Sequence, residues 1–111
     1  MNAQETVDYL LQLPKETEYF SNDGTILKVI PKTAEYPKLS AMQKFVGGRI
    51  ERVSLANGDD LIIYEEGLYD DSPANQVATR LFHDDVGKEV VQENQLPPLF
   101  GNIIYLQGGL K

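Results

Sequence analysis

The sequence contains no cysteine and no tryptophan, and it has a single histidine, His83. Without cysteine the chain forms no disulfide and offers no thiolate nucleophile, which is typical of intracellular proteins. Zinc sites are built mainly from cysteine and histidine, so one histidine leaves such a site without its ligand set. His83 stands near the end of a predicted helix, where an imidazole cation is favoured, and we interpret it as a helix-end residue rather than a catalytic base. We therefore expect no metal site and no cofactor.

Long apolar runs and basic residues are also scarce. No stretch approaches the roughly 18 apolar residues of a membrane-spanning helix. Residues 1–13 carry Glu5 and Asp8 and lack the basic start of a signal peptide. The 10 lysine and arginine residues are outnumbered by 17 aspartate and glutamate residues, which leaves a net charge of -7. Because a field of this sign repels phosphate backbones, we expect no direct binding to a nucleic acid. The lack of a membrane-spanning run and of a signal peptide leads us to expect a cytoplasmic protein that binds no membrane.

The chain does contain the pattern of one small mixed domain, residues 1–111. Its 41% hydrophobic content is globular, and apolar residues recur at helical or strand spacing between turn signals. The predicted elements are a helix over 3–12, a hairpin of 17–21 with 25–30, a helix over 39–46, a hairpin of 49–55 with 61–64, a helix over 73–82 capped by Ser72, a short strand or irregular edge within 86–94, and a strand over 103–106. We predict an α+β fold: one mostly antiparallel sheet built from two hairpins and a C-terminal strand, with three short helices packed on it.

Four glycines are predicted to be structural. Gly47 follows the 39–46 helix at the position that favours a left-handed residue, and Gly48 then frees the chain to enter the next strand. Gly58 belongs to an Asn-Gly hairpin turn, and Gly67 ends the following strand. A phosphate-binding loop needs a different glycine spacing and precedes a helix, so Gly47 and Gly48 do not form one.

The predicted strands differ in how they are covered. Val53 and Leu55 share one face while Ile50 lies on the other, so we predict a bulge near Glu51 and Arg52 that brings all three apolar residues to the core. The runs LIIY and IIYL are continuously apolar, which predicts strands covered on both faces. They offer more apolar surface than three short helices cover, which makes a homodimer a further expectation.

Acidic pairs do not form a recognisable catalytic or calcium site. Glu65 and Glu66 end a predicted strand, where neighbours point to opposite faces, so at most one of them serves any site. The aspartate pairs at 59–60 and 70–71 do not match the spacing of a calcium-binding loop and are interpreted as turn residues. We therefore predict a protein that is not an enzyme.

Basic and aromatic residues suggest binding instead. Lys44, Arg49 and Arg52 are close in sequence, where they either pair with nearby acids, the interpretation we favour, or bind a phosphate or a carboxylate-bearing ligand. Six tyrosines exceed what a small core holds, and exposed tyrosines such as Tyr69 are common in contact surfaces.

The segments LSAMQKFVGGRIERVSL, IIYEEG and PANQVAT in the middle of the chain resemble a family of small uncharacterised proteins of phages, plasmids and some bacteria. The family pattern is L-x-x-(L/M)-Q-x-x-V-G-G-x-I-E-x-V, then N-E-E-G, then P-x-N-x-x-A-T. The matching residues are Leu39, Met42, Gln43, Val46, Gly47, Gly48, Ile50, Glu51, Val53, Glu65, Glu66, Gly67, Pro73, Asn75, Ala78 and Thr79. The first 24 residues have no counterpart, and Tyr64 stands where the family often has asparagine. The resemblance extends over about 39–107 and implies a phage or mobile-element origin, with the host cytoplasm as location, but no activity.

Matched polar residues such as Gln43, Glu66 and Asn75 are not explained by packing alone. They form either a buried hydrogen-bond network or a small ligand pocket, and we favour the network. The leading functional hypothesis is a non-enzymatic accessory protein that binds a host protein. The alternative is a protein that binds or sequesters a nucleotide-type small molecule, with Lys44, Arg49 or Arg52 on the phosphate.

Overall fold

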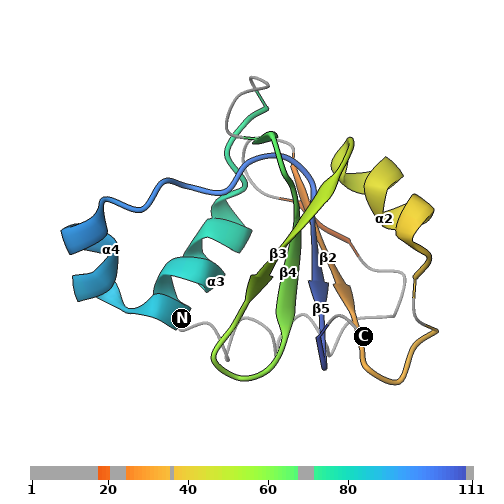
Figure 1. Cartoon of the computed structure of the whole chain (residues 1–111), viewed down its shortest axis with the longest axis horizontal. Coiled ribbons are helices and arrows are strands. Elements are labelled where there is room, and N and C mark those ends of the chain that lie inside the picture. The colour runs from red at the N-terminus through yellow and green to blue at the C-terminus, as the bar shows by residue number, and fades with distance from the viewer. Residues whose placement is uncertain (1–17, 21–24, 36, 68–71, 110–111) are drawn as a thin grey trace.

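The computed structural model describes residues 18–20, 25–35, 37–67 and 72–109 (Figure 1). The predicted helix over 3–12, the residues that join the two strands of the first predicted hairpin, and Tyr69 lie outside the described residues. The described part of the chain folds into an α+β structure around one sheet, as predicted.

The sheet has five strands in the order β1-β2-β5-β4-β3. They are β1 Glu18–Phe20, β2 Ile26–Ile30, β3 Ile50–Ser54, β4 Asp60–Tyr64 and β5 Ile103–Leu106. The two predicted hairpin pairings, β1 with β2 and β3 with β4, are antiparallel. The prediction of a mostly antiparallel sheet built from hairpins is wrong, because β2 and β5 run parallel and make the sheet mixed. Hairpin turns determine the direction of neighbouring strands only, and the pairing of β2 with β5 joins strands far apart in sequence.

The helices cover both faces of this sheet. Helix α2 (Leu39–Val46) lies on one side, and α3 (Gln76–Val86) lies on the other, followed by α4 (Lys88–Asn94) (Figure 1). The predicted bounds of α2 are confirmed. Helix α3 begins after an Asn75 cap, so the predicted start at Ser72 and Pro73 is wrong.

Helix α4 replaces the predicted strand or irregular edge. Its two valines suggested a strand, but lysine, glutamate and glutamine in the same segment are good helix formers. None of its residues is buried, and Val90 is 43% exposed. No sheet contact therefore holds this segment extended, and its intrinsic helical preference decides the structure.

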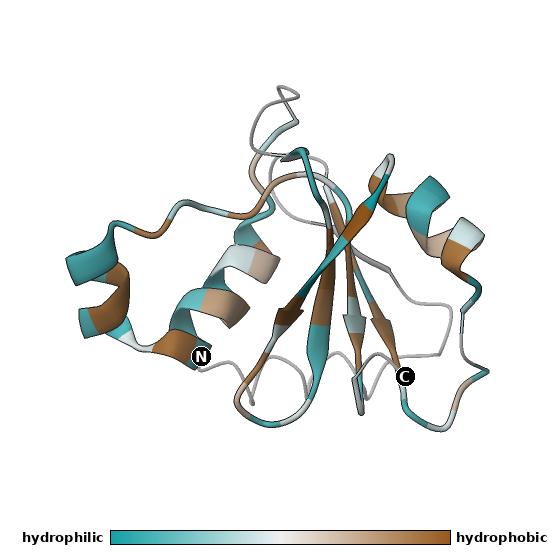
Figure 2. Ribbon diagram, in the orientation of Figure 1, coloured by the Kyte–Doolittle hydropathy of each residue, from teal (hydrophilic) through white to brown (hydrophobic). Residues whose placement is uncertain are grey.

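Two apolar clusters form, one on each face of the sheet. Figure 2 shows hydrophobic residues along the strands and on parts of each helix. The cluster under α3 contains Leu27, Val29, Leu55, Leu61, Ala78, Leu81, Leu99, Ile103 and Tyr105. The cluster under α2 contains Met42, Ile62, Ile104 and Leu106, with Ile30, Phe45 and Ile50 packed against it. The prediction that LIIY and IIYL are covered on both faces is confirmed.

Strand β3 contains no bulge at Glu51 and Arg52, contrary to the prediction. Its register with β4 is continuous from the Ile50–Tyr64 pair to the Ser54–Asp60 pair. Since each face of the sheet has its own cluster, Ile50 packs under α2 while Val53 packs under α3. The strand therefore needs no distortion to bury both.

Two of the four glycines predicted to be structural have a positive φ, and a third allows a side chain to approach closely. Gly47 has φ 107°, and its N–H donates to the Gln43 carbonyl at 2.9 Å, which confirms the predicted helix stop. Gly58 has φ 90° in the β3–β4 turn. Gly48 instead permits a close approach, because an added Cβ would lie 2.5 Å from Cε1 of Tyr64. Gly67 is buried three residues after the end of β4.

Replacing Gly48 by alanine is expected to lower the free energy of unfolding by about 1–3 kcal/mol, as overpacking does elsewhere. The cause would be the displaced ring of Tyr64. In a Tyr64→Ala background the same Gly48 substitution should cost much less, because the ring is gone. Urea unfolding of the four proteins of this double-mutant cycle measures the coupling. Equal costs in both backgrounds would contradict the ring contact as the cause.

Candidate functional site

An open cleft of about 270 Å³ lies between the ends of β3 and β4 and the segment that leads from α4 to β5. We call it the acidic cleft; it is lined by Glu51, Ile63, Tyr64, Glu65, Gly67, Pro97, Pro98, Leu99 and Phe100. Glu51 and Ile63 are cross-strand partners and stand on the α3 face of the sheet. The cleft is slightly smaller than a typical small-molecule pocket. Its size suits one or two side chains of a partner.

The wall formed by residues 97–100 is held in place by α3 and the residues before it. Thr79 Oγ1 accepts a hydrogen bond from the Leu99 N–H at 2.9 Å, and the Leu99 carbonyl accepts from the Asn75 N–H at 2.8 Å. Phe100 forms a β-bridge with Ala74. The two consecutive prolines add a backbone with restricted φ. The wall is therefore a preformed surface rather than a free loop.

The chemistry of the cleft combines apolar walls with a negative rim. Glu51 and Glu65 are exposed, and within the described ranges neither carboxylate has a hydrogen bond or an ion pair. Ile63, Leu99 and Phe100 supply the apolar surface. Such a site matches a long side chain with an apolar stem and a cationic end, as in lysine or arginine.

The structure places Glu65, and not the predicted Glu66, in the lining of the cleft. Both glutamates are exposed. Strand β4 ends at Tyr64, and residues 65 and 66 form a turn. Neighbouring side chains point to opposite faces only within a strand, so the prediction that Glu65 and Glu66 do so does not hold in this turn.

Asn75 is a buried structural residue. Its side chain is 0% exposed, and its Oδ1 accepts from the Ala78 N–H at 3.1 Å as the cap of α3. Its Nδ2 donates to the carbonyls of Ile26 at 3.1 Å and Gly101 at 2.9 Å. Within the described residues no hydrogen bond connects Asn75 with Gln43 or Glu66. The prediction that Gln43, Glu66 and Asn75 form one buried network is therefore wrong, and the three residues do not line one pocket.

Gln43, Lys44 and Arg52 lie on the α2 side of the sheet, whereas Arg49 directly precedes β3 and its carbonyl accepts from the Glu65 N–H at 2.8 Å. Gln43 is half-buried in α2, and its carbonyl accepts from Gly47 and Gly48 at 2.9 Å each. Lys44 is exposed in the last turn of α2. Arg49 and Arg52 are exposed, and Arg52 shares the face of β3 that bears Ile50. None of these cations lines the acidic cleft.

A second polar cluster, which the sequence analysis missed, joins the β3–β4 turn to the end of β5. The hydroxyl of the fully buried Tyr105 donates to Oδ2 of Asp59 and accepts from Nδ2 of Asn57 at 3.3 Å. The other oxygen of Asp59 accepts from the Gly108 N–H at 2.8 Å. Burial, followed by the Asp59 hydrogen bond, raises the pKa of Tyr105 above its ordinary value of 10.0. A tyrosine in an apolar strand needs a partner for its hydroxyl, which was the available signal.

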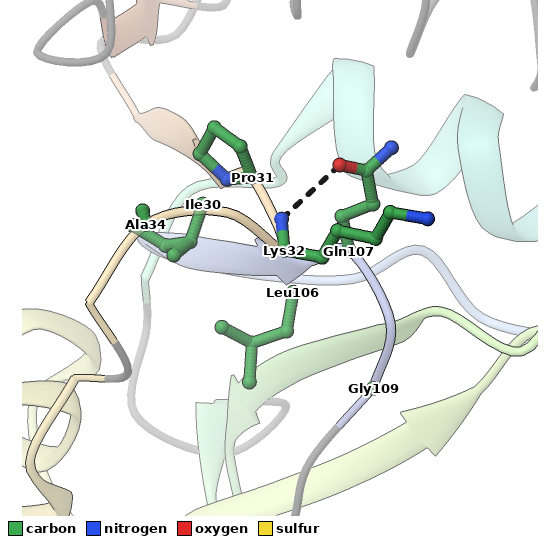
Figure 3. A pocket seen from close by; sticks show the side chains of 7 residues that line it. All are labelled: Ile30, Pro31, Lys32, Ala34, Leu106, Gln107 and Gly109. Carbon is green, nitrogen blue, oxygen red and sulfur yellow. Dashed lines mark hydrogen bonds between the residues drawn. The ribbon is translucent and has the colours of Figure 1, made fainter.

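A smaller cavity lies beside the ends of β2 and β5. It has about 20 Å³ and is lined by Ile30, Pro31, Lys32, Ala34, Leu106, Gln107 and Gly109 (Figure 3). The Lys32 N–H donates to Oε1 of Gln107 at 3.1 Å across it. This volume holds about one water molecule, so the cavity is no ligand site.

His83 lies at the end of a helix, as predicted. The Nε2 atom of His83 lies 3.4 Å from the Pro97 carbonyl, in the last turn of α3. Within the described ranges no three His, Cys, Asp or Glu side chains are grouped so that they would hold a metal ion. No helix in the described part of the chain has the length and apolar character needed to cross a membrane.

These features define a small α+β protein with a mixed sheet between helices and an open acidic cleft at one end of its edge hairpin. The chain belongs to the family described as Domain of unknown function (DUF3846), whose model matches residues 23–108. The expectation of an uncharacterised family is confirmed, and the match begins close to residue 24, before which the sequence analysis found no counterpart. No curated protein and no solved structure matches the chain.

Proposed function

We propose that this chain is a non-enzymatic accessory protein of a phage or other mobile element, and that it binds a basic segment of a host protein in the acidic cleft. The observation that carries the proposal is the pair of unpaired rim carboxylates, Glu51 and Glu65, beside an apolar wall. The net charge of -7 adds a long-range attraction for a basic partner.

The geometry favours a protein partner over the nucleotide-type ligand that was the alternative. A phosphate group would meet the negative rim of the cleft, whereas Lys44, Arg49 and Arg52 are exposed outside it. A basic side chain meets opposite charge and apolar contact in the same place. A thermal-shift screen separates the two, because a nucleotide at 100 times its Kd would raise stability by about 2.7 kcal/mol.

The rim carboxylates are better suited to binding than to acid–base catalysis. A carboxylate that acts as a general acid or base at neutral pH is usually buried or crowded by like charge, which raises its pKa. Glu51 and Glu65 are both exposed. They are therefore in the setting of a charged rim that steers and orients a partner.

Selection of a random peptide library on the full chain tests the proposal. Enriched peptides should be rich in lysine or arginine next to apolar residues. The double variant Glu51→Lys/Glu65→Lys should weaken the binding of a selected peptide at least about tenfold, since each reversed charge replaces a modest attraction by a repulsion. Isothermal titration calorimetry at low salt measures the change.

The matched control is Glu66→Lys/Glu89→Lys, which changes the net charge equally at two exposed positions outside the cleft lining. It should reduce affinity only slightly, through the weaker overall field. Equal losses in the two double variants would show that total charge, and not the cleft, drives binding. A library that enriches no basic peptide would overturn the proposal.

A further inference from the structure

We propose that the partner segment binds as an additional β-strand along the free edge of β3, with a basic side chain beside Glu51 at the mouth of the acidic cleft. This inference rests on the proposed function and specifies its binding mode. Strand β3 is last in the sheet order, so among the described residues only β4 pairs with it. In the described part of the chain the sheet thus ends in an edge that a peptide backbone can extend.

The hydrogen-bond pattern shows which backbone groups are available. The Glu65 N–H donates to the Arg49 carbonyl at 2.8 Å, and the Leu55 N–H donates to the Asp59 carbonyl at 2.9 Å. Hydrogen-bonded and non-hydrogen-bonded pairs alternate along an antiparallel ladder. Glu51 and Val53 therefore also face β4 with their backbone groups.

The backbone groups of the alternate residues, Ile50, Arg52 and Ser54, point to the outer edge. Within the described ranges their N–H and carbonyl groups have no backbone partner. They present a short row of donors and acceptors at the spacing that an extended peptide requires. A segment of about five residues is enough to pair with it.

Side chains along β3 add specificity to this backbone template. Glu51 and Val53 stand on the face of the cleft, and Arg52 stands on the α2 face with Ile50. A residue of the added strand opposite Glu51 lies about 5 Å away and is favoured when basic. Its neighbour in sequence projects to the other face near Arg52 and is favoured when acidic or polar. The fitting partner is an extended segment whose basic and apolar residues alternate with polar or acidic ones.

A basic partner fits this edge better than a second copy of the chain. Two copies each carry a net charge of -7 and repel each other. The antiparallel register that overlaps all of β3 with β3 of a second copy sets Arg52 opposite Arg52, and like charges directly opposite are unfavourable. The charges therefore favour a different chain.

Hydrogen exchange followed by NMR tests the binding mode, with a selected basic peptide as the probe. On binding, exchange of the Ile50, Arg52 and Ser54 amides should slow at least about tenfold, because each enters a new ladder. The Val53 amide, which already faces β4, should change far less. Slow exchange of the three edge amides in the free protein, or no slowing when the peptide binds, would overturn the inference.

A pair of substitutions at one position gives an independent readout. Arg52→Pro removes an N–H that β4 does not use and places a ring on the outer edge, where proline is tolerated in sheets. It should weaken peptide binding at least about tenfold, whereas Arg52→Ala, which keeps the backbone N–H and loses only an exposed side-chain contact, should weaken it about twofold to threefold. Equal affinities for the two variants would overturn strand addition.

The two proposals fail in different ways. If no basic peptide is selected, the proposed function itself is wrong. If peptides bind and the cleft variants weaken them while the edge amides and Arg52→Pro have no effect, the cleft binds side chains without strand addition. If light scattering shows a dimer whose edge amides are protected without peptide, the occupant is a second copy and the inference is wrong.

Discussion

Replacing Asn75 by alanine should lower the free energy of unfolding by about 4 kcal/mol, the largest effect expected for a substitution in this protein. The variant loses the cap of α3, since Oδ1 no longer accepts from the Ala78 N–H. It also leaves two carbonyls, those of Ile26 and Gly101, without their side-chain donor. Urea unfolding followed by circular dichroism measures the difference.

Two further variants separate the parts of this effect. Asn75→Ser keeps a capping oxygen but lacks the two N–H donors, so it should recover only the cap contribution of about 1 kcal/mol. Asn94→Ala is the matched control, because its amide makes one hydrogen bond to the Val90 carbonyl on an exposed helix. A loss at Asn75 no larger than at Asn94 would contradict a central structural role for Asn75.

Replacing Tyr105 by phenylalanine should lower the free energy of unfolding by about 2 kcal/mol at neutral pH. The variant keeps the buried ring but leaves the carboxylate of Asp59 without its hydroxyl donor. Asn57 also loses its acceptor. Because Asp59 further binds the Gly108 N–H, the segment after β5 should exchange its amides faster in the variant.

The contribution of Tyr105 should also depend on pH. The folded state raises the pKa of Tyr105 above its ordinary value of 10.0, so the folded protein retains the phenol proton that the unfolded chain releases. This contribution is complete below about pH 10 and falls as pH rises beyond it, by at most about 1.36 kcal/mol per pH unit. Unfolding of wild type and Tyr105→Phe at neutral and alkaline pH measures it. A difference between the two proteins that stays constant up to about pH 11 would contradict the linkage.

Local sequence signals predicted the local structure well. The Asn-Gly turn at Asn57–Gly58 and the helix stop at Gly47 depend on the φ preferences of a few neighbouring residues, and the structure confirms both. The continuous apolar runs of β4 and β5 correctly predicted strands buried on both faces. The cap of α3 is Asn75, so the predicted start of this helix at Ser72 and Pro73 lies three residues too early.

Errors arose where distant parts of the chain meet. The bulge predicted at Glu51 assumed a single core, whereas helices on both faces create two clusters and leave β3 regular. The prediction of a strand within 86–94 is wrong because it relied on two valines. No strand of the sheet pairs with this described segment, which forms helix α4 instead. The candidate glutamate was Glu66, but Glu65 lines the cleft because the chain leaves β4 in a turn.

By itself the sequence determined the hairpins, the helix of residues 39–46, the central buried strands and the acidic character of the surface, because spacing, turn residues and net charge are local or additive properties. Only the tertiary structure decided that β2 pairs in parallel with β5, that β3 is left at the edge, and that residues 97–100 form a wall opposite Glu51 and Glu65. These features result from contacts between segments tens of residues apart. Their energies depend on which surfaces meet, and no local pattern in the chain records that choice.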